Sequence, residues 1–359
     1  MRNDVGFEAG RFADSDETFH RNMAARRAHL PGAMLATATH DHKRGEDVRA
    51  RLAVLSEMPA EWAAALGRWI SASAPPWPGE AAMLFQTMVG AWPPLLDAAD
   101  RDGVAAFAGR LAAWQEKALR EAKLETDWTA PDEVYGEAAR EFLTGLLSGP
   151  LLRDIAAFAH RLAPIGAVNG LAQCLIKLTA PGVPDLYQGT EFWDFSLVDP
   201  DNRRPVDFAV RMQSVAAAPP LADLAGPWRD GRIKQHLIRR TLALRRALPQ
   251  LFAAGDYVPL TAEGPAARHV LAFARRWEGA AAVTIVPRFA ARLCAADGGI
   301  AIPAAAWGDT SLRLPLGMAA RHLRLVDLLG PVPVALLVAP RDSAPFEQVF
   351  MDRMADFVA

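Results

Sequence analysis

Apolar residues recur at helical spacing along the first part of the chain. Residues 14–30 have an acidic start and are followed by Pro31 and Gly32, which predicts one helix. Residues 33–39 are small and apolar and predict a short, fully buried strand. From Glu46 onward, apolar positions at spacings of four and three predict a second helix with one buried face.

The second predicted helix carries charge on its solvent side. Asp47 and Arg51 are four residues apart there, which predicts an exposed i,i+4 ion pair. Apolar stripes continue in the segments that follow, and we interpret Trp62 and Trp69 as core residues of this region.

The helical pattern extends to about residue 178. Residues 151–178 predict helices on either side of Pro164, because a proline removes a backbone hydrogen bond from a helix interior. Together these segments predict a helical subdomain over residues 46–165.

The character of the sequence changes at residue 181. A turn and a short strand over residues 183–187 lead into a long polar loop, and a basic helix follows over residues 231–248. Long polar loops inside compact domains are usually functional. Strands that alternate with helices predict a parallel sheet, and two such strands form no stable sheet on their own. The sequence therefore predicts an α/β domain that is part of something larger.

From about residue 250 the pattern becomes all-β. Four short segments of strand type alternate with turn residues, which predicts a small β-sandwich over residues 250–345 with a boundary near Pro249. Residues 346–359 predict a short amphipathic helix. The four strand segments are residues 269–277, 281–289, 323–329 and 334–340.

Composition and charge narrow the class of protein. The chain has 359 residues, of which 51% are hydrophobic and 22% are charged, and its net charge is −2. That charge gives no general attraction to nucleic acid or to anionic membranes. The pattern predicts neither a secretory signal sequence nor a membrane span. Cys174 and Cys294 are far apart and are interpreted as reduced thiols, which predicts a cytoplasmic protein.

Ionisable residues crowd together after the first predicted strand. His40, Asp41, His42, Lys43 and Arg44 follow one another directly. They form either a solvated turn or the rim of a polar pocket. A metal site is not expected, because the two histidines have no evident third ligand.

Two long motifs favour the interpretation of these residues as the rim of a polar pocket. The sequences MLATATHDHKRGEDVRARLAVLSEMPAEW (residues 34–62) and LTAPGVPDLYQGTEFWDFSLVDPDNRRPVDF (residues 178–208) resemble the maltooligosyl trehalose synthases, a family among the α-amylases of glycoside hydrolase family 13. The resemblance covers nearly the whole chain and concerns the C-terminal half of that family. It implies the last part of an α/β fold, a (β/α)8 TIM barrel with a helical insert between strands seven and eight, followed by a β-sandwich. The implied parts are the end of barrel helix six and strand seven (1–45), the helical insert (46–165), barrel helix seven, strand eight, an active-site loop and barrel helix eight (166–249), the β-sandwich (250–345) and an additional helical tail (346–359).

The resemblance also implies chemistry. Members of the family use an Asp nucleophile, a Glu general acid/base and a third Asp that grips ring hydroxyls. In retaining enzymes the first two carboxylates are roughly 5–5.5 Å apart. Asp41 matches the third carboxylate, His40 matches the hydroxyl-binding histidine of the family, and Lys43 matches a lysine near the first subsites. Arg44 is a further candidate contact to the substrate.

The second motif adds candidate substrate-binding residues, several of which have a structural alternative. The candidates are Tyr187, Gln188, Glu191, Asp201 and Arg203. Tyr187 could equally be a core tyrosine, Glu191 could hold a neighbouring arginine, and Arg203 could pair with Asp199. Trp193 is either a platform for a sugar ring or a core residue.

The sequence contains no motif that resembles the nucleophile or the acid/base, which belong to barrel strands four and five. We therefore expect the chain to be inactive alone and to work with the missing N-terminal barrel half. The implied reaction is an intramolecular transglucosylation that turns the reducing-end α-1,4 linkage of a maltooligosaccharide into an α,α-1,1 linkage, with no cofactor. Two alternatives stay open, a fragment of an α-amylase-type hydrolase and a non-catalytic sugar-binding or interaction protein.

Overall fold

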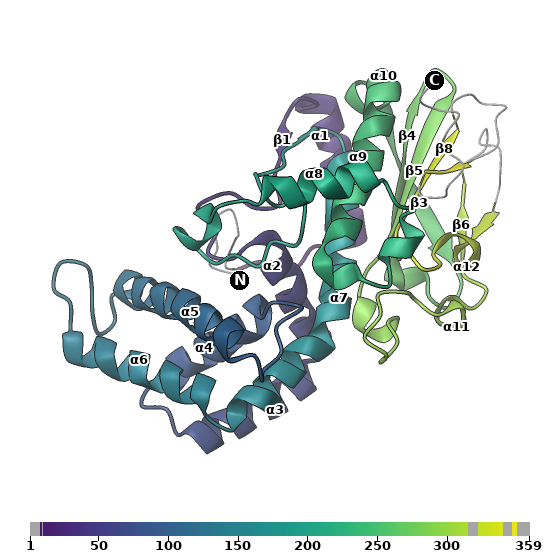
Figure 1. Cartoon of the computed structure of the whole chain (residues 1–359). Helices are drawn as coiled ribbons and strands as arrows, with labels where there is room; N and C mark the ends of the chain where they lie inside the picture. Colours follow the sequence, from purple (N-terminus) through teal and green to yellow (C-terminus); the bar gives the residue numbers. More distant parts are fainter. Residues whose placement is uncertain (1–7, 9, 315–321, 340–346, 350–359) are drawn as a thin grey trace. The chain divides into compact units, whose positions relative to one another are not determined.

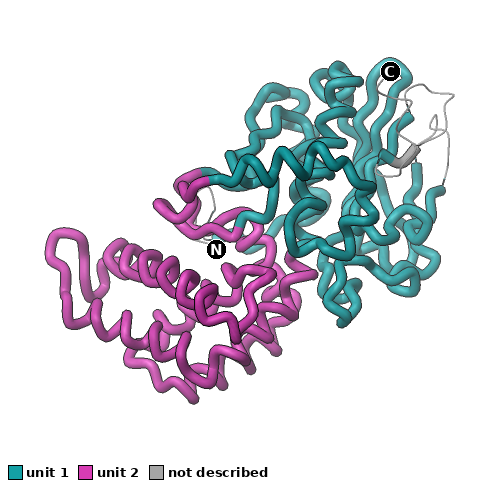
Figure 2. Tube along the Cα trace, in the orientation of Figure 1, with its two compact units in different colours: residues 1–39, 167–194, 206–359 teal, residues 40–166, 195–205 magenta. Residues whose placement is uncertain are grey.

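The chain folds into two compact units, which Figure 2 shows in different colours. The computed structural model describes residues 8, 10–314, 322–339 and 347–349. The first of the units, the helical unit, comprises His40–Gly166 and Phe195–Pro205. The other, the mixed unit, comprises Met1–Thr39, Ala167–Asp194 and Val206–Ala359.

The helical unit consists of α-helices and one polar loop (Figure 1). Asp100 and Asp132 accept backbone N–H groups at the starts of α5 and α6, and Pro59 and Pro78 open α3 and α4, so the sequence marks where these helices begin. The elements are α2 (Glu46–Ala53), η1 (Val54–Ser56), α3 (Pro59–Ser73), α4 (Pro78–Ala91), α5 (Arg101–Ala122), α6 (Glu133–Ser148), the first part of α7 (Leu151–Thr179) and η2 (Asp201–Arg203).

Aromatic side chains form the core of the helical unit. Trp69 is fully buried, and its ring centroid lies 5.4 Å from that of Phe85, 5.5 Å from that of Phe158 and 6.0 Å from that of Trp62. The indole N–H of Trp69 donates to Asp154 at 2.7 Å, so the polar atom of this buried ring has a partner. The prediction of a core residue is confirmed for Trp69, whereas Trp62 packs against it from a half-buried position.

Helix α7 runs through Pro164 as one helix of 29 residues. The predicted interruption at this proline is therefore wrong. A proline removes one backbone hydrogen bond, but a helix whose two flanks are both packed can continue past it. By length and composition alone α7 could cross a membrane, yet 83% of its apolar window is buried inside the protein, as in the core helix of a globular domain.

The mixed unit contains two short parallel strands. β1 (Met34–Leu35) pairs with β2 (Val183–Pro184), and Met34 lies opposite Val183. The predicted parallel pairing is confirmed, but both strands are shorter than predicted. The expectation of a fully buried first strand is wrong, because Met34 is 73% exposed and Val183 is 51% exposed. Among the described residues no third strand extends this pair, which leaves its apolar side chains uncovered.

Helices of the mixed unit agree with two sequence predictions. The helix expected over 14–30 is α1, which starts at the cap Ser15, and the basic helix expected over 231–248 is α9. The helical elements are α1 (Asp16–His29), the second part of α7, α8 (Phe208–Ala217), η3 (Ala222–Leu224), η4 (Trp228–Asp230), α9 (Arg232–Ala247) and α10 (Pro249–Ala253).

A seven-stranded antiparallel sheet forms the rest of the mixed unit, in the order β7-β6-β3-β4-β5-β8-β9. β3 (Asp256–Glu263) changes partner along its length, because residues 256–260 pair with β4 and residues 261–263 pair with β6. β3 therefore connects two parts of a curled sheet by pairing with a strand of each. The other elements are β4 (Val270–Trp277), β5 (Ala280–Pro287), β6 (Ser311–Arg313), β7 (His322–Arg324), β8 (Ala335–Ala339), β9 (Glu347–Gln348), η5 (Ala267–His269), η6 (Ala290–Arg292), α11 (Ala304–Trp307) and α12 (Leu325–Leu328).

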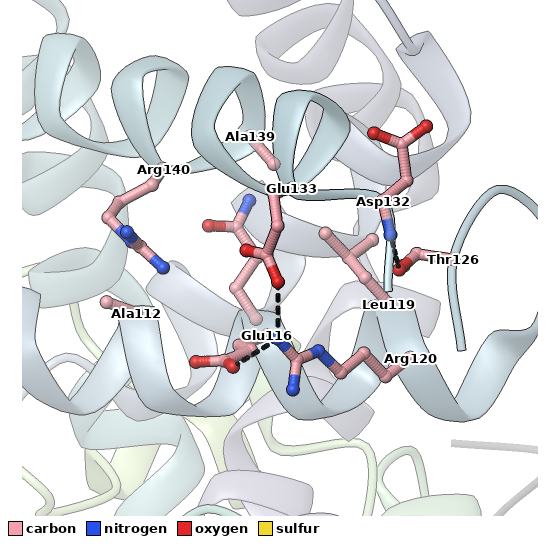
Figure 3. A pocket seen from close by; sticks show the side chains of 11 residues that line it. Ala112, Glu116, Leu119, Arg120, Thr126, Asp132, Glu133, Ala139 and Arg140 are labelled. Carbon is pink, nitrogen blue, oxygen red and sulfur yellow. Dashed lines mark hydrogen bonds and ion pairs between the residues drawn. The ribbon is translucent and has the colours of Figure 1, made fainter. Parts of the chain in front are cut away.

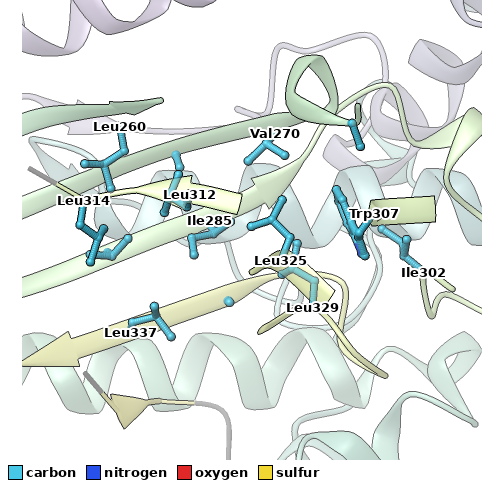
Figure 4. Packing of buried hydrophobic residues seen from close by; sticks show 14 of the residues in the cluster. Leu260, Val270, Ile285, Ile302, Trp307, Leu312, Leu314, Leu325, Leu329 and Leu337 are labelled. Atoms are coloured by element: carbon cyan, nitrogen blue, oxygen red, sulfur yellow. The ribbon is translucent and has the colours of Figure 1, made fainter. Parts of the chain in front are cut away.

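Apolar side chains of this sheet pack against its two short helices (Figure 4). Leu260, Ile285 and Leu337 come from three different strands, and all are buried. Trp307 from α11 and Leu325 from α12 join the same cluster and are fully buried. The short helices therefore cover one face of the sheet.

Details of the C-terminal region differ from the sequence prediction. The strand expected over 323–329 is only β7, because the chain turns at Leu325 into α12. β3 and β6 were not predicted at all. Glu347 and Gln348 form β9, where a helical tail over 346–359 was expected, and residues 350–359 lie outside the described residues. A sandwich of two separate sheets stays a prediction, since the described strands of this region form one sheet.

Buried arginines connect this sheet to the end of α7. Arg275 of β4 is 1% exposed and donates to the carbonyl oxygen of Thr179 at 3.2 Å, and Arg245 of α9 donates to that of Leu178 at 2.8 Å. The last carbonyl groups of a helix have no partner within the helix, so these bonds satisfy the end of α7. The sheet and the end of α7 therefore lie in one compact unit, and a domain boundary near residue 249 stays a prediction.

Candidate functional site

The residue predicted to be catalytic lies on an exposed turn of the helical unit. His40 and Asp41 form this turn, which follows β1 and precedes α2. Nε2 of His40 lies 3.3 Å from Oδ1 of Asp41, and the two side chains are 59% and 67% exposed. The turn thus presents a carboxylate and an imidazole to solvent, a pair that can accept and donate hydrogen bonds to hydroxyl groups.

A loop over residues 195–203 lies beside this turn. The backbone N–H of Gly45 donates to the carbonyl oxygen of Ser196 at 2.8 Å. The side-chain amide of Asn202 donates to the carbonyl oxygen of His40 at 2.7 Å, although the two residues are 162 positions apart in the sequence. These bonds hold the backbone that carries Asp41.

Two basic side chains on one face of α5 bind this loop. Arg110 donates to both carboxylate oxygens of Asp201 at 2.9 Å and to the carbonyl oxygen of Phe195 at 2.6 Å. Lys117 donates to the carbonyl oxygen of Asp199 at 2.9 Å. The sequence analysis missed both cations. Their spacing of seven was the available signal, since residues at i and i+7 share one face of a helix.

Asp201 holds the loop, and its predicted role as a substrate contact stays a prediction. Its side chain is 11% exposed, and it accepts the backbone N–H of Leu197 at 2.7 Å in addition to Arg110. Burial by itself raises the pKa of Asp201, but the hydrogen bond and charge of Arg110 and the N–H of Leu197 outweigh it, so the pKa is lowered.

Asp201→Asn is expected to reduce the free energy of unfolding by about 1–2 kcal/mol at neutral pH, because a charge-assisted pair becomes a neutral one. A carboxyl group with a lowered pKa in the folded state stabilises the fold above its unfolded pKa of about 3.9, and that stabilisation is lost as the pH falls through the folded pKa. The difference between wild type and variant should therefore disappear in acid. Urea titrations on both sides of about pH 4 measure it. A difference that does not change with pH would show that the charge of Asp201 does not hold the loop.

Lys43 and Arg44 differ in their exposure. Nζ of Lys43 lies 2.8 Å from Glu121 of α5, and the side chain remains 42% exposed. Arg44 is 7% exposed, and its guanidinium donates to the hydroxyl of Thr87 at 3.0 Å. The Arg44 side chain therefore belongs to the interior of the helical unit, and its contact with substrate stays a prediction.

Helix α2, which follows the turn, contains buried charged residues. The sequence predicted Asp47 and Arg51 on an exposed face, but α2 is buried on all sides, so this prediction is wrong. Close approach of other helices is the reason: a Cβ on Gly166 of α7 would lie 2.8 Å from Cα of Arg51, and one on Gly90 of α4 would lie 2.8 Å from Leu52. The buried charged residues of α2 are Glu46, Asp47, Arg49 and Arg51.

Arg51 connects the end of α4 to the loop beside the turn. Its Nη1 atom donates to the carbonyl oxygens of Gly90 at 3.1 Å and Trp92 at 2.6 Å, groups left open where α4 ends. Its guanidinium also lies 4.1 Å from the centroid of the Phe195 ring. Burial lowers the pKa of Arg51 to about 9, and the charge of Asp47 opposes that shift, so the group is charged at neutral pH.

Three of the predicted substrate contacts belong to the mixed unit. Tyr187 is half-buried and Gln188 is exposed, and both follow β2. Glu191 pairs with Arg211 of α8 at 3.2 Å, which is the structural alternative that the sequence left open.

Structural alternatives also hold for Arg203 and Trp193. Arg203 of the helical unit pairs with Asp199 at 2.6 Å. Trp193 of the mixed unit is half-buried, and its indole N–H donates to the carbonyl oxygen of Trp228 at 2.7 Å. The described part of the chain contains no group of three or more His, Cys, Asp or Glu side chains that could hold a metal ion. The exposed chemistry of the turn is therefore hydrogen bonding by His40 and Asp41.

Comparisons with known proteins find curated relatives and solved structures of one kind. No family model matches the chain. A curated protein of Mycobacterium tuberculosis named maltooligosyl trehalose synthase is 38% identical over 351 residues, which are 95% of this chain and 42% of the relative. The structure of maltooligosyltrehalose synthase from Arthrobacter ramosus matches with a TM-score of 0.77 at 34% identity, over 94% of this chain and 42% of that chain. A crystal structure of a further maltooligosyl trehalose synthase matches with a TM-score of 0.71 at 29% identity, over 80% of this chain and 38% of that chain.

These matches confirm the resemblance that the two sequence motifs predicted. They extend over nearly all of this chain, and the chain spans less than half the length of the relatives.

Proposed function

We propose that this chain, a homologue of the maltooligosyl trehalose synthases, provides one wall of the active site of such an enzyme. The substrate is a maltooligosaccharide, whose reducing-end α-1,4 linkage is rearranged to α,α-1,1. The chain contributes Asp41, and the nucleophile and the general acid/base come from a polypeptide that carries the other barrel strands. The exposed His40–Asp41 pair, held by Asn202, is the observation that carries this proposal.

The proposal assigns β1 and β2 to the seventh and eighth strands of a (β/α)8 barrel. The two strands are parallel neighbours, the turn with Asp41 follows the carboxyl end of β1, and Tyr187 follows that of β2. Active sites of such barrels are built from the loops at the carboxyl ends of the strands. Both polar segments of this chain leave the strands at that end.

Asp41 acts in this mechanism by binding hydroxyl groups of the sugar ring that reacts. The ring distorts and gains positive charge in the transition state, so a carboxylate that accepts its hydroxyls binds the transition state more tightly than the ground state. His40 and Lys43 add hydrogen bonds to the substrate on either side of this group. The nucleophile forms a covalent glycosyl intermediate, which the 1-hydroxyl of the released glucose attacks. Water must be excluded during this step.

A polypeptide that carries the other barrel strands is the proposed partner of this chain. Met34 and Val183 are opposite each other on the two-stranded sheet and are largely exposed, whereas parallel sheets are normally covered on both faces. The remaining barrel would cover them. The proposal requires no cofactor and involves neither nucleic acid nor membrane. It places the reaction in the cytoplasm, in line with the interpretation of Cys174 and Cys294, which are far apart in the sequence, as reduced residues.

A product assay on maltopentaose tests the proposal. The purified 359-residue chain should give no product alone, because loss of a nucleophile removes many orders of magnitude in rate. A chimera in which this chain replaces the matching part of the Arthrobacter ramosus enzyme should form a non-reducing, trehalose-ended sugar. Shorter reducing sugars would instead indicate an α-amylase-type hydrolase, and binding without turnover would indicate a non-catalytic protein. Robust formation of trehalose ends by the isolated chain would contradict the proposed division of catalytic groups.

A further inference from the structure

A small hollow lies between α5 and α6 of the helical unit (Figure 3). Its space is about 30 Å³, the share of one molecule in liquid water. It is too small for a sugar ring but has room for a hydroxyl group. The polar residues that line it are Gln115, Glu116, Arg120, Thr126, Asp132, Glu133 and Arg140.

Gln115 has a polar side chain that lacks a partner. The residue is only 9% exposed, and its amide forms no hydrogen bond with a residue that the structure describes. The amide atoms are open to solvent, so water can bond to them in the free protein and a ligand hydroxyl would replace that water. Because Gln115 lines the hollow, a hydroxyl placed there can donate to its oxygen or accept from its N–H group.

Both positively and negatively charged side chains surround the hollow. Arg120 pairs with Glu116 at 2.9 Å and lies 3.9 Å from Glu133, and Figure 3 shows both carboxylates directed at its guanidinium. Arg140 lines the same hollow from α6. Two carboxylates disfavour a free anion, and the charged lining disfavours an apolar peptide. A neutral ligand with several hydroxyl groups can use both signs, since carboxylates accept from hydroxyls and guanidinium groups donate to them.

Trp128 lies next to Arg120 on the loop between α5 and α6. It is 54% exposed, and the Arg120 guanidinium lies 4.9 Å from the centroid of its ring. Asp127 accepts the backbone N–H groups of Thr129 at 2.6 Å and Ala130 at 2.8 Å, so the loop that presents the indole is ordered by its own hydrogen bonds. Arg120 occupies one face of this indole, and the exposed remainder of the ring offers an apolar surface against which a sugar can pack.

We propose that Trp128 and the hollow form a second binding site for a glucosyl unit of an α-1,4-glucan. The ring packs on the exposed indole, one hydroxyl enters the hollow and bonds to Gln115, and Glu116 and Arg120 bind neighbouring hydroxyls. The choice of glucan rests on the proposed function. Arg120 and Glu121 are adjacent, so they lie about 100° apart around α5. The site therefore lies on a different face of α5 from Glu121, which pairs with Lys43 beside the catalytic turn.

Titration calorimetry with maltoheptaose on the full 359-residue chain tests this site. Trp128→Ala should weaken binding about tenfold, and Gln115→Leu, which keeps the size of the side chain, about fivefold. Leu124→Ala is the matched control, because Leu124 is 75% exposed on the same loop and does not line the hollow. It should bind as the wild type does.

Equal affinities of the wild type, Trp128→Ala and Gln115→Leu would overturn the inference, as would the absence of maltoheptaose binding to this chain. An equal loss in Leu124→Ala would also overturn it, because the effect would then belong to the loop as a whole. These outcomes are separate from the proposed function. The chimera assay on maltopentaose measures product formation, which a lost second site leaves in place, whereas a chimera without activity leaves the calorimetric result unchanged.

Discussion

Asp41→Asn, introduced into an active chimera, is expected to lower kcat by roughly 10²–10³-fold with a much smaller change in KM. Asparagine keeps the size of the side chain and most of its hydrogen-bonding geometry but removes the charge. The proposed contact strengthens only as the ring becomes cationic, so its loss acts on the transition state. The Asp41 side chain is 67% exposed, so folding should be unaffected. Steady-state kinetics on maltopentaose, with circular dichroism to check the fold, provide the measurement.

Neighbouring residues serve as controls for this result. His40→Ala should have a smaller effect than Asp41→Asn, because an imidazole beside the carboxylate is a ground-state contact. His42→Ala should change kcat very little. Lys43→Ala should mainly raise KM, since the half-exposed amine is proposed to contact the substrate next to the cleaved bond. A near-normal kcat in Asp41→Asn together with a large loss in His42→Ala would show that the motif is aligned one position away from the true catalytic carboxylate.

Arg51→Met is expected to lower the free energy of unfolding by about 3 kcal/mol, a large share of the stability of a typical domain. Methionine fills similar space but leaves the carbonyl oxygens of Gly90 and Trp92 without their donor. It also leaves the buried Asp47 without the neighbouring positive charge. The midpoint of urea unfolding, followed by circular dichroism, measures the effect.

Two further variants separate the role of Arg51 from a general effect of losing an arginine. Arg68→Met is the matched control, because Arg68 is 60% exposed and its ion pair with Asp154 is a surface contact. It should change stability by no more than about 0.5 kcal/mol. Arg51→Lys keeps the charge but lacks the planar fork of donors, so its stability should be intermediate. Equal urea midpoints for Arg51→Met and Arg68→Met would show that Arg51 does not cap α4.

Local pattern was sufficient for many elements of this fold. The sequence prediction agrees with the helices α1 and α9 and with the strands β4, β5 and β8. The reason is that the spacing of apolar residues within a short stretch of sequence indicates which side of an element is buried. β3 was missed, since its strand state depends on pairing with two partners distant in the sequence. The interruption predicted at Pro164 was wrong for a related reason, because packing along α7 outweighs one lost hydrogen bond.

For the candidate site, the sequence by itself determined the family resemblance and the place of His40 and Asp41 on a polar turn after a strand. Side chains on an exposed turn make few distant contacts, so their surroundings follow from the adjacent residues. Only the tertiary structure decided that Arg44 is buried and that Asp201 holds the loop. The partners of these two residues are 43 and 91 positions away, and burial or pairing over such distances depends on how helices pack, which no local pattern contains.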